Sequence, residues 1–164
     1  MALPVVPGEE LLAWVEQTGE GWQALLAKQP EILQLPCDIA KAQTVAALLQ
    51  HIVAVELRYA ERLHGLAATP YDAVPMDSAT ALYATHERAM KMLRALGEHD
   101  AAWWDGQISF ATRSAGEKSA LRRTVFAHAL LHSIRHYAQL ATLVRQHGVA
   151  PGWPMDFLFL QSVR

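Results

Sequence analysis

The chain of 164 residues is 52% apolar and 18% charged, and its formal net charge at pH 7 is -2. This length suits one domain, spanning residues 1–164, with a substantial apolar core. The small net charge offers no broad basic surface for nucleic acid, and no apolar run reaches the roughly 18 residues that cross a bilayer, so we expect neither nucleic acid nor a membrane as a partner.

The first predicted helix covers residues 9–28, where apolar residues recur at spacings of three, four and seven. Gly19 and Gly21 each weaken a helix by about 1 kcal/mol relative to alanine. If this helix is kinked or broken, we expect the kink or break to lie at these glycines. A second helix is predicted over residues 39–64, with Asp38 as its capping residue and Gly65 as its C-terminal stop.

A loop is predicted over residues 66–77, which contain two prolines. The third predicted helix covers residues 78–96 and ends near a glycine. Either Asp77 or Ser78 would cap its first turn, because short polar side chains accept hydrogen bonds from the free backbone N–H groups there.

Between residues 100 and 116 the helical period is lost, and Ile108 and Phe110 alternate with smaller residues. This alternation predicts a short extended or hairpin segment with little strand. The fourth helix is predicted over residues 117–147 with Gly148 as its terminator, and a turn and a short apolar C-terminal helix follow it.

Four long helices, each with one apolar face, predict an all-α fold. The expected architecture is an antiparallel or crossover four-helix bundle, with a short extended segment before the fourth helix and a short helix at the C-terminus. The sequence has no internal repeat and no glycine-rich pattern that would bind phosphate.

Cysteine usage and the amino terminus both favour a cytoplasmic protein. Cys37 is the only cysteine, so neither an intramolecular disulfide nor a zinc site of paired cysteines can form. The first ten residues lack the basic and long apolar segments of a secretory signal. We therefore expect the protein in the reducing cytoplasm.

Three histidines follow one stripe of the fourth predicted helix. His128, His132 and His136 are spaced four residues apart, and each step of four turns about 40° round a helix. Their stripe is otherwise apolar, and a buried imidazole that lacks partners costs about 1–3 kcal/mol per unsatisfied group. A shared metal ion would satisfy these rings, and hydrogen bonds to water and backbone are the alternative.

A third ligand must come from another helix. His51 is the best candidate, because it lies in the middle of the second predicted helix at the edge of its buried face. Three histidine ligands would leave at least one coordination position open, which points to chemistry or ligand binding. His128 has three interpretations: a ligand in place of His136, a group that supports a ligand, or a boundary residue.

Two segments resemble the DinB-like proteins, a family of four-helix bundles. T-V-A-A-L-L-Q-H-I-V-A-V-E-L-R-Y-A-E-R-L-H-G is similar to the second helix of that family, and H-S-I-R-H-Y-A-Q-L-A-T-L-V-R-Q-H-G to its fourth. The tail P-G-W-P-M-D-F-L-F-L is similar to the usual C-terminal end. The resemblance implies a divalent metal ion held by His51, His132 and His136, most often nickel or zinc. Iron is a third ion that binds imidazole.

The same resemblance implies a homodimer and a thiol-dependent transferase or isomerase that uses bacillithiol, mycothiol or glutathione. The family pattern places Arg-Gly after the second histidine of the pair, where this chain has Tyr137 and Ala138. That departure leaves the three ligands in place but removes the family arginine. Arg135, on the other side of His136, is the residue that would substitute for it.

Three functional hypotheses share this site. The first is thiol-dependent transfer or isomerisation of a small-molecule substrate, in which Arg58 or Arg62 would orient a carboxylate of the thiol. The second is a non-catalytic metal-binding or stress-response module that acts as a dimer. The third is metal-dependent hydrolysis, for which Glu56 and Glu61 are the acidic candidates but have no fixed relation to the site.

Overall fold

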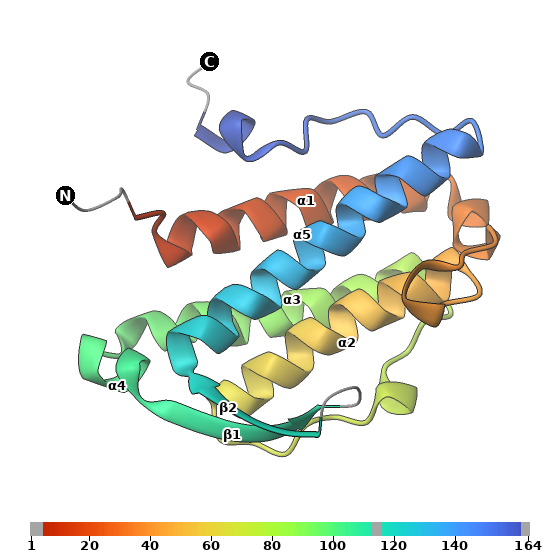
Figure 1. Cartoon of the computed structure of the whole chain (residues 1–164). Helices are drawn as coiled ribbons and strands as arrows, with labels where there is room; N and C mark the ends of the chain where they lie inside the picture. Colours follow the sequence, from red (N-terminus) through yellow and green to blue (C-terminus); the bar gives the residue numbers. More distant parts are fainter. Residues whose placement is uncertain (1–4, 113–115, 162–164) are drawn as a thin grey trace.

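The computed structural model describes residues 5–112 and 116–161, and it is mostly helical, as the sequence predicts. The four long helices are α1 (Gly8–Lys28), α2 (Val45–Leu63), α3 (Ala79–Ala95) and α5 (Arg122–Gln146). α2 packs against α3 and α5, and α1 packs against the same two helices. Figure 1 shows that α2 and α3 run in one direction while α1 and α5 run in the other. Within the described residues, no helix has the length and apolarity needed to cross a membrane.

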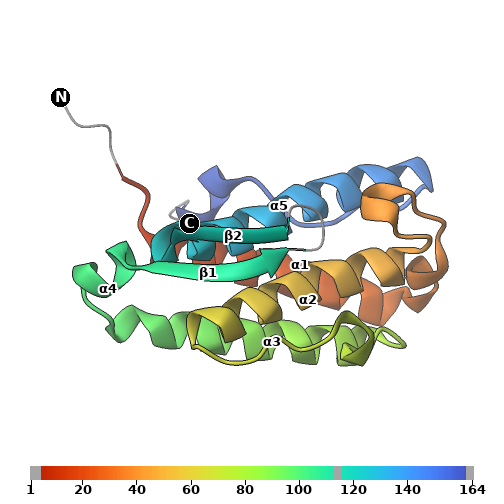
Figure 2. The same ribbon diagram turned by 60° about the horizontal axis from the view of Figure 1, so that its bottom comes forward.

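Shorter elements connect the long helices. α4 (Ala101–Asp105) precedes a hairpin of β1 (Gln107–Thr112) and β2 (Gly116–Leu121), which pair antiparallel. The hairpin lies beside the second half of α2 (Figure 2), where Phe110 contacts Tyr59 and Arg62 donates a 2.8 Å hydrogen bond to the Ala111 carbonyl. The other connections contain the short 3-10 helices η1 (Pro30–Gln34), η2 (Ile39–Lys41), η3 (Tyr71–Ala73) and η4 (Leu96–Glu98), and a fifth, η5 (Phe157–Gln161), follows α5.

The predicted start and cap of the second helix were wrong. Ala40 and Lys41 have φ values of 53° and 64°, a left-handed conformation that a right-handed helix cannot contain. Asp38 makes no capping hydrogen bond, and Thr44 caps α2 instead, because its hydroxyl oxygen accepts from the Ala47 amide at 3.2 Å. The other end is as predicted, since α2 stops at Leu63 and Gly65 has a φ of 71°.

The predicted start of the fourth helix was also wrong, whereas the predicted short hairpin is present as a small two-stranded sheet whose second strand begins at Gly116. Residues 117–121 form most of β2, so α5 begins at Arg122. The pairing joins Gln107 to Leu121 and Thr112 to Gly116, which are distant partners that a local helical pattern does not reveal. Ser78 caps α3, as one of the two candidates, and the short helix predicted near the C-terminus is the 3-10 helix η5.

The apolar core falls into two clusters separated along the helices by buried polar residues. The cluster near η1 is centred on Trp22, Ile52 and Tyr83, and the cluster near α4 contains Leu12, Leu57 and Leu93. The polar layer between them takes one residue from each long helix, namely Thr18, Glu56, His86 and Ser133.

Glu56 and His86 form a hydrogen-bonded pair inside this layer. Glu56 is 0% exposed, and its Oε2 atom accepts a 2.7 Å hydrogen bond from His86 Nδ1. Burial disfavours a proton on His86, but the Glu56 carboxylate, with smaller contributions from Glu16 and Glu87, raises the pKa of His86. α1 passes His86 at Gly19, where a Cβ atom would come within 2.5 Å of His86 Nε2. The helix therefore continues through Gly19 without a break, and the glycine serves close packing.

The Glu56–His86 pair predicts a pH dependence of stability. A folded-state pKa above the unfolded value of about 6.5 stabilises the protein fully below that pH, and the contribution is lost as the pH rises through the folded pKa. The free energy of unfolding should therefore fall above about pH 6.5, by at most about 1.4 kcal/mol per pH unit. Glu56→Gln removes the negative partner, so urea unfolding of this variant should lack the fall. Equal slopes for the two proteins would contradict the assignment.

Candidate metal centre

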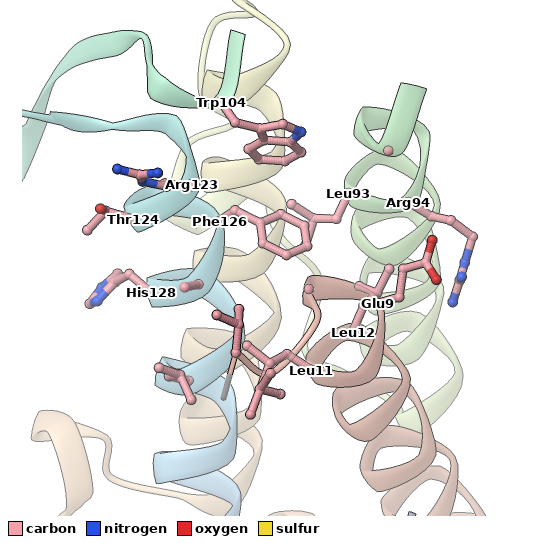
Figure 3. Close-up of a pocket in the computed structure, with 16 residues that line it drawn as sticks. Glu9, Leu11, Leu12, Leu93, Arg94, Trp104, Arg123, Thr124, Phe126 and His128 are labelled. Carbon is pink, nitrogen blue, oxygen red and sulfur yellow. The ribbon is translucent and has the colours of Figure 1, made fainter. Parts of the chain in front are cut away.

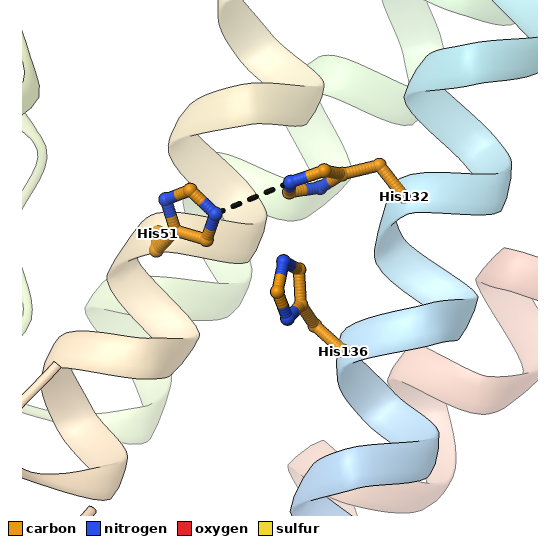
Figure 4. Close-up of side chains that lie close together, drawn as sticks. All are labelled: His51, His132 and His136. Carbon is orange, nitrogen blue, oxygen red and sulfur yellow. Dashed lines mark hydrogen bonds between the residues drawn. The ribbon is translucent and has the colours of Figure 1, made fainter. Parts of the chain in front are cut away.

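Three histidines meet between α2 and α5. His51 projects from the middle of α2, while His132 and His136 lie one turn apart on the facing side of α5 (Figure 4). One ring nitrogen from each histidine lies within 4.8 Å of the other two. The Nε2 atoms of His51 and His132 are 3.2 Å apart. The structure thus brings together the three residues that the sequence predicted as metal ligands.

The two nitrogens of His136 have different partners. Nδ1 donates a 2.7 Å hydrogen bond to the side-chain oxygen of Gln139, which cannot donate in return. Nε2 faces the other two rings and lies 3.1 Å from Nη2 of Arg135, so it must accept. Both contacts select the same tautomer, in which Nε2 keeps its lone pair. A hydrogen bond that holds the second nitrogen of a ligating histidine is a regular feature of metal sites.

The cluster favours neutral imidazoles. Burial, followed by the neighbouring His136 and His51 rings, lowers the pKa of His132 to about 3. Burial likewise lowers the pKa of His136, with a smaller contribution from the positive charge of Arg135. His132 Nδ1 is buried and has no hydrogen-bond partner among the described residues. Neutral imidazole is the form that binds a metal ion.

The spacing and chemistry of the nitrogens fit a metal ion. Two nitrogens bound about 2.1 Å from one ion, at angles of about 90–109°, lie about 3.0–3.4 Å apart. The 3.2 Å separation between His51 and His132 falls in this range. Imidazole nitrogens suit zinc, nickel and iron. The three residues therefore have the donors and one of the distances that such a site needs, and the lowered pKa values of His132 and His136 favour the neutral form that binds metal.

The loop between α2 and α3 places Tyr71 over His51. The two rings are nearly parallel, at 9°, with centroids 6.3 Å apart. Gln50 holds this loop by donating to the carbonyl oxygens of Tyr71 and Val74. Nothing in the sequence marked Tyr71 as part of the site, because its contact with His51 depends on how the loop folds back onto α2.

Two arginines of α2 that the sequence suggested as substrate contacts are engaged with the protein. Arg58 donates to the carbonyl oxygen of Thr69, and its guanidinium lies 4.6 Å from the Tyr71 ring centroid. Arg62 is turned toward the hairpin, where it contacts Phe110 and the Ala111 carbonyl. Arg135, which the sequence identified as a substitute for the family arginine, lies with its Nη2 atom 3.1 Å from His136 Nε2.

His128 lies outside the cluster of three. It is exposed, and its ring contacts Tyr59 at 5.3 Å and His132 at 5.8 Å between centroids. It also borders an apolar pocket of about 790 Å³ between the ends of α1 and α5 (Figure 3). Leu11, Phe126 and other apolar side chains line that pocket, and none of the three clustered histidines does.

Comparison with known proteins supports a family assignment. The model of the DinB family matches residues 4–163, which include all four long helices and all three clustered histidines. No curated protein matches the chain.

The Gln139 contact predicts the tautomer of His136 in the metal-free protein. Long-range proton–nitrogen NMR should show a proton on Nδ1 and none on Nε2, because Gln139 accepts only at its oxygen. Gln139→Leu should populate the second tautomer as well, since Arg135 alone then favours the first. Gln146→Leu, an exposed change at the end of α5, is the matched control and should leave the spectrum unchanged. An unaltered His136 spectrum in Gln139→Leu would refute this role.

Proposed function

Because the chain belongs to the DinB family, we propose that it binds a divalent metal ion through His51, His132 and His136 and uses it in thiol-dependent transfer or isomerisation of a small molecule. The observation that carries the proposal is the meeting of three imidazoles from two helices, with ligand atoms within 4.8 Å of one another. Nickel and zinc are the proposed ions, and iron is the third candidate.

The proposed chemistry needs an ion with an open coordination position. Such an ion is a Lewis acid that lowers the pKa of a nearby thiol or water. Three histidine ligands leave at least one position open. Gln139 would keep the lone pair of His136 directed at the site, and Tyr71 would restrict the movement of His51.

Hydrolysis is less well supported than thiol chemistry. A hydrolase of this kind would need a general base beside the bound water. Glu56 is buried against His86, and Glu61 accepts hydrogen bonds from Thr69 and a 3.2 Å contact from Arg88. Both carboxylates that the sequence offered as bases are therefore committed to other contacts.

The second candidate function is a non-catalytic metal-binding module that works as a homodimer. Leu131 is 50% exposed on α5 and borders the apolar pocket that Leu11 and Phe126 also line. Apolar surface of this kind often marks protein contacts. This observation supports association between copies of the chain, and it does not depend on turnover at the histidines.

The proposed metal site predicts which histidine substitutions remove the ion. Wild-type protein purified and dialysed should hold about one divalent ion per chain by elemental analysis. His51→Ala, His132→Ala and His136→Ala should each lose most of it, because two imidazoles hold an ion far more weakly than three. His128→Ala is the matched control on the same stripe and should keep the full load. A full load in His51→Ala would remove that residue from the site.

The proposed activity is tested with the metal-loaded protein, a thiol and an electrophile. We expect bacillithiol, mycothiol or glutathione to be consumed at a rate that disappears after chelation and in His132→Ala. The loss should be at least about 100-fold, since removal of a ligand disrupts the ion itself. A protein that holds its ion and turns over none of these thiols would favour the non-catalytic module.

A further inference from the structure

Arg135 occupies the ring nitrogen that the proposed metal site requires. Its Nη2 atom lies 3.1 Å from His136 Nε2. The other nitrogen of the ring is already bound to Gln139 at 2.7 Å. An imidazole nitrogen has one lone pair in the ring plane, so Nε2 cannot accept from Arg135 and bind an ion at the same time. Metal binding through this nitrogen requires the guanidinium to leave it.

Few contacts hold Arg135 in this position. The residue is exposed on α5, and none of the described carboxylates forms an ion pair with it within 4.0 Å. Arg58 and Arg62 of α2 differ, because each donates to a backbone carbonyl and contacts an aromatic ring. A displaced Arg135 side chain would therefore remain close to the site with its hydrogen-bond donors available.

With a divalent ion bound, the site would carry a net positive charge. The three predicted ligands are imidazoles with no charge to offset that of a divalent ion. The acidic residues of α2 do not compensate, because Glu56 is paired with His86 and Glu61 with Thr69 and Arg88. A substrate that enters such a site gains from carrying negative charge, and a guanidinium binds a carboxylate with two parallel hydrogen bonds.

We propose that Arg135 covers the ligand nitrogen of His136 in the metal-free protein and, once the ion displaces it, anchors a carboxylate of the substrate beside that ion. This inference rests on the proposed metal site and deepens it, because it assigns the substrate to the anionic class. It also gives Arg135 two contacts that exclude each other, one in each state of the site.

Zinc affinity tests the first contact. Competition with a chelating indicator, in a buffer without carboxylates, should show that Arg135→Ala binds zinc about five- to tenfold more tightly than wild type, because no hydrogen bond to Nε2 has to be broken. Arg135→Gln is a second variant of similar length and should also bind more tightly. Arg145→Ala, an exposed change ten residues further along α5, should match wild type.

Acetate tests the second contact. Cobalt(II) is loaded in place of zinc, and the visible spectrum is followed as acetate is added, because carboxylate binding at the ion changes its absorption. Wild type and Arg145→Ala should reach half of the spectral change at about a tenfold lower acetate concentration than Arg135→Ala. This readout requires no turnover and no knowledge of the natural substrate.

The outcomes separate this inference from the metal site on which it rests. Tighter zinc binding in both Arg135 variants, together with weaker acetate binding in Arg135→Ala, supports the proposal. Equal or weaker zinc binding in the variants overturns the covering role, and equal acetate dependence overturns the anchoring role. Wild-type protein that binds neither zinc nor cobalt overturns the proposed metal site itself, and with it both roles.

Discussion

The buried Glu56–His86 pair constrains how the long helices pass one another. A carboxylate that is 0% exposed needs its partner, because an unpaired buried charge costs several kcal/mol. His86 provides that partner only when α2 and α3 are aligned as observed, and α1 can cross this level only at Gly19. α5 contributes Ser133 to the same layer, one residue after His132. The pair therefore fixes the alignment of α2, the helix that carries His51, relative to α3 and α1.

Equal spacing along α5 does not give its three histidines equal surroundings. Each step of four residues turns about 40°, so the direction changes by about 80° from His128 to His136. That rotation takes the stripe from an exposed position beside Tyr59 to a buried position beside Gln139. His132 lies between them and contacts both neighbouring rings. The rotation separates a pair of candidate ligands from a third histidine that only borders them.

Periodicity and family resemblance were enough to predict the interiors of the helices and the three clustered histidines, and contacts between distant segments account for what they missed. Residues 117–121 have no local feature that excludes a helix, and they form a strand because β1 pairs with them. Asp38 has the composition of a cap, but the left-handed turn at Ala40 moves the helix start to Thr44. Gly21 resembles a weak point in a helix, yet Trp153 packs where its Cβ would be.

The departure from the family motif has a structural reason in this chain. Position 137 faces the core, where Tyr137 is 1% exposed and its ring stacks on Trp22 with centroids 6.2 Å apart. An arginine there would lose the stacking of Tyr137 on Trp22 and would place its charge in the core, where burying a charge is costly. Position 135 is about 200° away round the helix and exposed, yet still within reach of His136 Nε2. The position before His136 therefore carries a positive charge beside the histidines without burying it, and this is where the chain has Arg135.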